Sequence, residues 1–81
     1  MKTLRLFSRS ECHLCEVLAA DLAPLIGDRA RVQVVDIDGD PGLERAYGLR
    51  IPVLVGDDGR ELSSYPLDTG AVAAYLGLDD G

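Results

Sequence analysis

Residues 3–26 read TLRLFSRSECHLCEVLAADLAPLI, and this stretch decides the fold. From Thr3 to Phe7 apolar side chains alternate between two faces, which is typical of a strand. From Cys12 onward the apolar spacing lengthens to about 3.6 residues, which predicts a helix that ends at Gly27. The residues that we expect on its inward stripe are Leu14, Val17, Leu18, Leu22, Leu25 and Ile26. The stretch therefore predicts a strand, a polar loop and a helix that begins at a cysteine.

A second strand and a short helix are predicted next. β-branched residues favour a strand over residues 32–37. Asp40 can cap the helix that follows, and Pro41 suits its first position because no amide donor is needed there. We expect Gly48 to end this helix in a left-handed cap, with Leu49 folded back onto the last turn.

The remaining residues predict a hairpin and a last helix. Two strands, over residues 51–55 and 60–64, flank a turn at 57–59 in which Gly59 tolerates a positive φ. The last helix covers about residues 68–76, with Asp68 or Thr69 as its cap. Val72, Tyr75 and Leu76 are expected to face inward.

This order is β-α-β-α-β-β-α, which predicts an α/β fold within one domain, residues 1–81. The first βαβ unit must be a right-handed parallel crossover. We expect a four-stranded mixed sheet with three helices that cover both of its faces. Arg5 fits this arrangement poorly, because the first strand would lie centrally with both faces covered.

The composition excludes several classes of protein. Hydrophobic residues make up 47% and charged residues 27% of the 81 residues, the balance of a globular domain rather than of a disordered tail or a fibre. The formal charge is −6, Lys2 is the only lysine, and the arginines are scattered. Binding to nucleic acid phosphates requires clustered basic residues, so neither nucleic acid nor an anionic membrane surface is an expected partner.

The expected compartment is the cytoplasm. No apolar run approaches the roughly 18 residues of a membrane span, and the first residues contain no apolar segment of a signal peptide because Arg5 and Arg9 interrupt it. Two cysteines are too few for the disulfide scaffold of a small secreted protein. We further expect a monomer.

The spacing of Cys12 and Cys15 is the most informative feature of the sequence. Two cysteines separated by two residues at a helix start can close a small disulfide ring. The unpaired amides and the positive end of the helix dipole favour a thiolate at Cys12, which is the nucleophile of thiol–disulfide exchange. Cys15, one turn deeper, can then attack the mixed disulfide. In a cytosolic βαβ protein this pattern indicates dithiol redox chemistry.

Two other interpretations of the cysteines stay open at this point. Both can be small buried hydrophobic residues, since free cysteine is often buried. Both can also be metal ligands, but zinc requires four ligands and only His13 accompanies the pair. We therefore expect no metal site.

Charged neighbours act on Cys12 in opposite directions. Arg9 lies three residues before it and can stabilise a thiolate, whereas Glu11 and Glu16 oppose ionisation. Protonated His13 would stabilise the thiolate, and neutral His13 could relay a proton. The alternative for His13 is an exposed residue that only adjusts the redox potential.

Two segments together resemble a known family. They are Phe7-Ser8-Arg9-Ser10-Glu11-Cys12-His13-Leu14-Cys15 and Gly48-Leu49-Arg50-Ile51-Pro52-Val53-Leu54. The chain is similar to the glutaredoxin branch of the thioredoxin-like fold, and in particular to short bacterial glutaredoxin-like proteins with a Cys-His-Leu-Cys centre. The resemblance covers almost the whole chain.

The resemblance implies roles for individual residues. Cys12 would be the attacking and Cys15 the resolving cysteine. The Ile51–Pro52 bond would be cis and lie against the disulfide, which leaves the backbone of Ile51 free to pair with an extended peptide or glutathione. Arg9 stands where glutaredoxins usually have a lysine that holds a glutathione carboxylate, and a solvated surface charge is its alternative role.

The chain also departs from glutaredoxins. The segment Leu62-Ser63-Ser64-Tyr65-Pro66 replaces their Gly-Gly pair, and the Cys-Pro-Tyr-Cys centre is replaced as well. Asp68 could accept the glutathione amine, although helix capping alone explains it. Glutathione is therefore only one possible reductant, and a flavoprotein reductase is another.

Three functions remain for the structure to address. The first is a thiol–disulfide oxidoreductase or electron carrier that acts on a protein or glutathione disulfide without a bound cofactor. The second is a non-catalytic peptide-binding module, which has no need for the resolving Cys15. The third, cluster ligation by Cys12 with glutathione, is typical of relatives with one active-site cysteine.

Overall fold

The computed structural model describes residues 2–77. Its elements follow the predicted order, and their bounds differ from the expected ones by one or two residues. They are β1 (Lys2–Ser8), α1 (His13–Ile26), β2 (Ala30–Asp36), α2 (Pro41–Tyr47), β3 (Val53–Val55), β4 (Glu61–Ser63) and α3 (Thr69–Leu76). The prediction of a three-helix, four-strand α/β fold is confirmed.

The four strands form one mixed sheet in the order β2-β1-β3-β4. β1 runs parallel to β2, with Leu6 opposite Val34, and antiparallel to β3, with Leu6 opposite Leu54. β3 and β4 form the antiparallel hairpin, with a register shift between Leu54 and Val55. β1 is therefore a central strand, and β2 is an edge strand that pairs only with β1.

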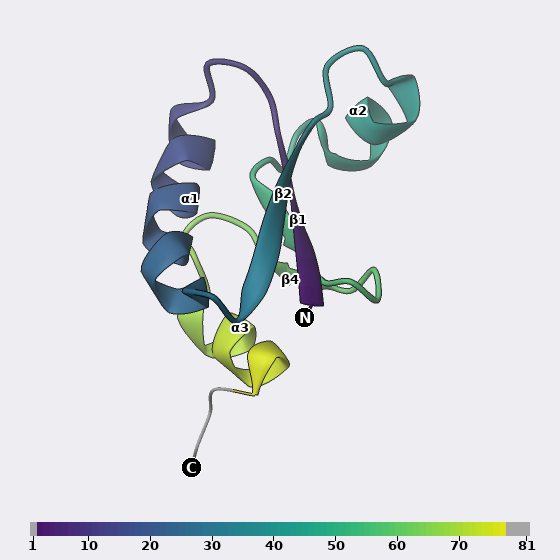
Figure 1. Cartoon of the computed structure of the whole chain (residues 1–81). Helices are drawn as coiled ribbons and strands as arrows, with labels where there is room; N and C mark the ends of the chain where they lie inside the picture. Colours follow the sequence, from purple (N-terminus) through teal and green to yellow (C-terminus); the bar gives the residue numbers. More distant parts are fainter. Residues whose placement is uncertain (1, 78–81) are drawn as a thin grey trace.

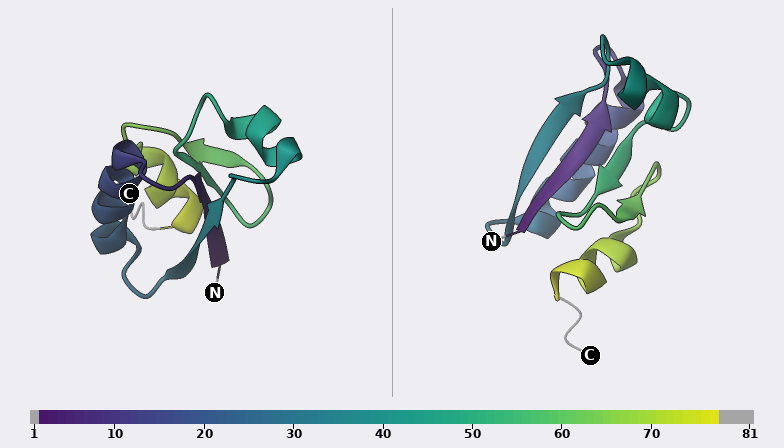
Figure 2. Two further views of the ribbon diagram at one scale, coloured as in Figure 1. Left: turned by 90° about the horizontal axis from the view of Figure 1, so that it is seen from above. Right: turned by 90° about the vertical axis from the view of Figure 1, so that its right-hand side faces the viewer.

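Helices cover the two faces unequally (Figures 1 and 2). α1 and α3 lie on one face, where the larger apolar cluster forms from buried residues such as Leu6, Leu18 and Val72. On the opposite face a smaller cluster contains Phe7 and Val53, and Tyr47 of α2 stacks on the Phe7 ring at 4.3 Å between centroids. α2 has only seven residues, and it packs beside the end of β1 that leads to the first cysteine.

This arrangement explains Arg5. The residue lies on the same face of β1 as Phe7, but it is exposed, because the short α2 covers that face only near Phe7. Helices thus lie on both faces as expected, and Arg5 reaches water where α2 leaves its face of β1 open.

Caps mark the starts of the two later helices as predicted. The Asp40 carboxylate accepts hydrogen bonds from the amides of Gly42 and Leu43 at 3.0 and 3.1 Å. Asp68, rather than Thr69, caps α3 by accepting from the Ala71 amide at 3.0 Å. These bonds satisfy amides that have no partner within the helix.

The end of α2 differs from the prediction. Gly48 has φ −53° and ψ −35°, which is right-handed helical rather than left-handed. Its amide donates to the carbonyl of Glu44, and the amides of Arg50 and Ile51 both donate to the carbonyl of Tyr47. Leu49 is fully exposed instead of folded back. The helical turn continues through Gly48, where a Cβ would collide with the Glu44 carbonyl oxygen.

The inward stripe of α1 is also narrower than predicted. Its buried residues are Cys15, Leu18, Leu22 and Ile26. Leu14 is 43% exposed, because it lies in the first turn at the side of this stripe. The cysteine, and not the leucine before it, is thus the first side chain of α1 that enters the core.

Candidate functional site at the start of α1

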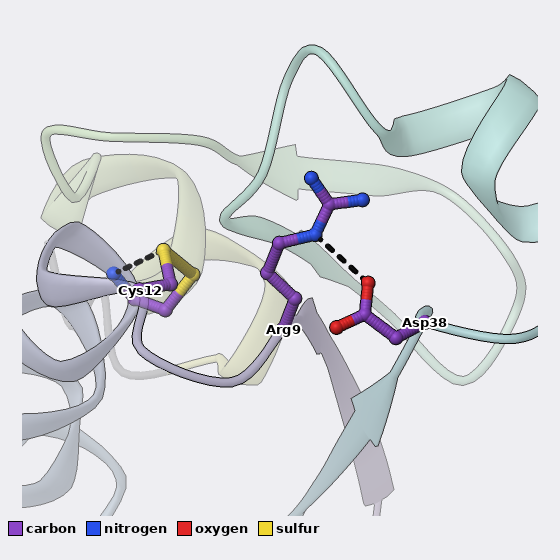
Figure 3. The surroundings of a disulfide bond; sticks show 4 residues. Arg9, Cys12 and Asp38 are labelled. Atoms are coloured by element: carbon purple, nitrogen blue, oxygen red, sulfur yellow. Dashed lines mark hydrogen bonds and ion pairs between the residues drawn. A yellow bond between two sulfur atoms is a disulfide. The ribbon is translucent and has the colours of Figure 1, made fainter.

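The two cysteines occupy the junction between the β1–α1 loop and α1. Cys12 is the N-cap of the helix, with extended backbone angles, and its Sγ accepts a hydrogen bond from the Cys15 amide at 3.2 Å. The two sulfurs are joined in a disulfide, with the Cα atoms 5.2 Å apart (Figure 3). A Cα separation of this size is ordinary for a disulfide, so the helix start already holds the pair at bonding range.

The two sulfurs differ in accessibility. Cys15 is 5% exposed and belongs to the buried stripe of α1, whereas Cys12 is only half-buried. An external disulfide can therefore reach Cys12 more easily than Cys15. This asymmetry fits an attacking Cys12 and a resolving Cys15.

Arg9 is paired with an acidic residue for which the sequence predicted no role. Its Nε lies 3.1 Å from Oδ1 of Asp38, in the loop between β2 and α2. Figure 3 shows the Arg9 side chain directed toward Asp38 rather than toward the sulfurs. The partnership could have been found from topology: β1 and β2 are parallel neighbours, so the loops that follow them meet at the same edge of the sheet.

The other charged neighbours lie at the surface. His13 is the first residue of α1, and it is exposed, as are Glu11 and Glu16. Glu11 has a φ of 61°, which is uncommon for a residue with a side chain and occurs here directly before the N-cap. The charged groups of this loop therefore surround an accessible Cys12 from the solvent side.

The Ile51–Pro52 bond is cis, as the family resemblance implies, and Tyr65–Pro66 is a second cis bond that the sequence reasoning did not anticipate. Pro52 is buried and Ile51 is half-buried. The amide of Ile51 is engaged with the carbonyl of Tyr47 at 3.1 Å. Backbone pairing with an extended peptide would therefore use the carbonyl oxygen of Ile51. The contact between Pro52 and the disulfide stays a prediction.

An ion pair that the sequence reasoning missed anchors the loop before Pro52. Arg50 makes two hydrogen bonds of 2.9 Å to the carboxylate of Glu61 in β4 and a third to the carbonyl of Ala46. The hydrogen bonds from Arg50 lower the pKa of the Glu61 carboxyl, and those to Glu61 raise the pKa of Arg50. The guanidinium also lies over the Tyr47 ring, 5.5 Å from its centroid. Arg50 thus ties this loop to β4 and to α2.

A pocket of about 180 Å³ adjoins the disulfide. Both cysteines form part of its wall, together with the apolar residues Leu6, Ala19 and Val34, the neutral polar residue Ser8, and the charged residues Arg9 and Glu16. The structure thus brings Cys12, Cys15 and Arg9 together around one pocket, whereas His13, Ile51 and Pro52 are not among the residues that line it. Two larger hollows, of about 420 and 440 Å³, adjoin β4 and contain neither cysteine in their walls.

Two further features of residues 2–77 bear on function. In this part of the chain no group of three or more His, Cys, Asp or Glu side chains is arranged to hold a metal ion. Within the same residues, no helix has the length and apolar character needed to cross a membrane.

Comparison with solved structures relates the chain to bacterial proteins and to thioredoxins. A structural genomics target from X. campestris is 40% identical, with 93% of this chain and 96% of that chain aligned and a TM-score of 0.76. A protein from Nitrosomonas europaea is 38% identical over 93% of this chain and 91% of its own, with a TM-score of 0.84. A thioredoxin mutant from Halobacterium salinarum is 26% identical over 95% and 73% of the two chains, with a TM-score of 0.59.

A family model matches the chain, whereas no curated protein does. The family model described as a glutaredoxin-like domain (DUF836) matches residues 3–77, which include both cysteines and Pro52. Since this match spans nearly the whole chain, the protein belongs to the glutaredoxin-like domain family, within the thioredoxin fold.

Proposed function

We propose that the protein is a thiol–disulfide oxidoreductase or electron carrier that uses the Cys12–Cys15 dithiol. The observation that supports this most directly is the capping geometry, in which Sγ of the more accessible Cys12 accepts the Cys15 amide at the start of α1. Hydrogen bonds from amides and the helix dipole stabilise a thiolate at this position. The same sulfur is within bonding range of Cys15.

The proposed reaction proceeds through two exchanges. The Cys12 thiolate attacks one sulfur of a substrate disulfide, which forms a mixed disulfide and releases the other sulfur as a thiolate that takes a proton from solvent. Cys15 then loses its proton and attacks Cys12 Sγ, which forms the internal disulfide and releases the second substrate thiolate to be protonated. In total two electrons pass from the protein to the substrate, and the two released thiolates take up two protons, one from solvent and one that balances the proton lost by Cys15.

The proposed electron donor is either glutathione or a flavoprotein reductase, and the proposed setting is the cytoplasm. Arg9 is a candidate to hold the carboxylate of glutathione. Because its Nε is bound to Asp38, the two terminal nitrogens would make this contact. Asp68 already accepts a hydrogen bond from Ala71, so an incoming amine would share its carboxylate with the helix cap.

A reduction assay with two electron sources tests the proposal. The purified protein is mixed with bis(2-hydroxyethyl) disulfide, and NADPH consumption is followed with glutathione plus glutathione reductase, or with thioredoxin reductase alone. We expect activity with one of the two sources, and none from Cys12→Ser. Cys15→Ser should retain the first exchange and accumulate a mixed disulfide, visible by mass spectrometry.

The result that would contradict the proposal is also specific. If reduced Cys12 shows the reactivity of an ordinary thiol and neither source supports turnover, the redox function is wrong. The peptide-binding module would then be the better description of this fold.

A further inference from the structure

The floor of the pocket beside the disulfide is built from three apolar residues on three elements. Leu6 comes from β1, Ala19 from α1 and Val34 from β2. Leu6 and Val34 are direct partners in the parallel register, so they lie on the same face of the sheet as α1. Both cysteines line the same pocket, which makes it continuous with the sulfur that we expect to react.

Val34 is unusually exposed for a valine on this face. Its side chain is 61% exposed, whereas its register partner Leu6 is 1% exposed. Val32 lies two residues earlier on the same face of the same edge strand, and it is 36% exposed and not part of the pocket wall. The apolar surface of β2 thus becomes more open toward the disulfide, where α1 leaves it uncovered.

The charged residues of the pocket favour a neutral occupant. The Nε of Arg9 is bound to Asp38, so part of its charge is already compensated. Glu16 is exposed and stands beside the apolar floor, where it would repel an acidic side chain. A basic side chain would have to leave water for a floor of three apolar residues, which is costly. An aliphatic side chain has no hydrogen bonds to water to give up, and it covers Val34.

We propose that this pocket is a subsite for an aliphatic side chain that neighbours the cysteine of a disulfide-bearing peptide or protein substrate. Its volume of about 180 Å³ suits such a group, since an apolar cavity of about 150 Å³ accepts a molecule of the size of benzene. This inference rests on the proposed exchange at Cys12, and it adds a preference for the sequence around the substrate cysteine. It assigns Val34 as a specificity-determining residue.

The test uses two small disulfides that differ only beside the cysteine. They are the oxidised dimers of Ac-Leu-Cys-Leu-NH2 and Ac-Ser-Cys-Ser-NH2, each mixed with the fully reduced protein in a single turnover that needs no reductase. We expect the leucine peptide to react about tenfold faster, the usual effect of filling a hydrophobic pocket. Val34→Thr keeps the shape of the side chain but adds a hydroxyl, and it should lower this ratio at least threefold.

Val32→Thr is the matched control, because it makes the same change on the same face of β2 outside the pocket. It should keep the wild-type ratio, and it should reduce the serine peptide at the wild-type rate. Equal rates for the two peptides in the wild type would overturn the subsite, as would a ratio that Val34→Thr leaves unchanged or that Val32→Thr lowers equally. If the wild type reduces neither peptide, the proposed function itself fails, which is a different outcome.

Discussion

Reduction of the Cys12–Cys15 disulfide should lower the thermal stability of the protein by a predictable amount. The disulfide closes a loop of only four residues, 12–15. In the chain-entropy description, such a loop restricts the unfolded chain enough to stabilise the folded state by about 2 kcal/mol. Reduction removes this restraint. It also frees Cys12 to ionise, and ionisation stabilises the reduced folded state if the helix start favours the thiolate.

The second effect is incomplete at neutral pH, because the contribution of a lowered thiol pKa is complete only above the ordinary value of about 8.5. We therefore expect the loop restraint to dominate at pH 7, with the oxidised form more stable by up to about 2 kcal/mol. This difference corresponds to a melting temperature up to roughly 8–16 °C higher.

The pH dependence separates the two contributions. Because the folded-state pKa of the thiol is the lower one, its contribution is absent at acid pH, grows as the pH rises through that value, and is complete above about 8.5. The difference in stability between oxidised and reduced protein should therefore become smaller as the pH rises from 6 to 9.

Calorimetry with and without a phosphine reductant measures this difference, and mass spectrometry verifies the two-hydrogen change. The Cys12→Ser, Cys15→Ser double variant is the control and should not respond to the reductant. A reduced form that melts at or above the oxidised form at pH 7 would refute the dominance of the loop restraint. A difference that stays constant between pH 6 and pH 9 would refute thiolate stabilisation at the helix start.

Three other predictions concern the scaffold. The hydroxyl of Tyr75 donates to the Asp57 carboxylate, which raises the pKa of Tyr75 from its ordinary value of 10.0. This bond stabilises the folded state below the unfolded-state pKa of the tyrosine, and the stabilisation is lost as the pH rises above that value. The free energy of unfolding in urea should therefore change more between pH 9 and pH 11 for the wild type than for Tyr75→Phe. Asp40→Ala removes the carboxylate that accepts two amides, and it should cost about 1 kcal/mol in the same assay at pH 7. Arg50 lowers the pKa of the Glu61 carboxyl, so this ion pair stabilises the folded state above the ordinary pKa of 4.5 and the stabilisation is lost as the pH falls through the folded-state pKa. In Glu61→Gln the free energy of unfolding should therefore depend less on pH on the acid side.

The parts of the fold that local chemistry determines could be predicted from the sequence. Apolar periodicity predicts β1 and α1, and Asp40 and Asp68 mark the starts of α2 and α3 because their carboxylates satisfy amides nearby in the chain. The end of α2 could not be predicted in the same way. Gly48 suggests a left-handed residue, but here its missing Cβ permits close approach to the Glu44 carbonyl in a right-handed turn. Sequence does not distinguish these two uses of glycine.

The cysteines of the site were predictable from their spacing alone, whereas the ion pairs leave no signal in the local sequence and require the strand order as well. Arg9 meets Asp38 across a separation of 29 residues, and Arg50 meets Glu61 across 11. Each pairing depends on which strands are adjacent in the sheet. The pocket at Val34 depends further on how far α1 extends over the edge strand, which no local pattern reports.

The three helices of this chain begin with the same type of interaction, and this links the reactivity of Cys12 to the fold. α2 and α3 are capped by the carboxylates of Asp40 and Asp68, while α1 is capped by Sγ of Cys12. A thiol or disulfide sulfur is a weak acceptor, whereas a thiolate is an anion at the positive end of a helix. Only ionised Cys12 therefore matches the two carboxylates as a cap. In the proposed exchange, the amide of Cys15 that completes the helix start is also the group that would stabilise the Cys12 thiolate, so one hydrogen bond would serve both the folding of α1 and the activation of its first sulfur.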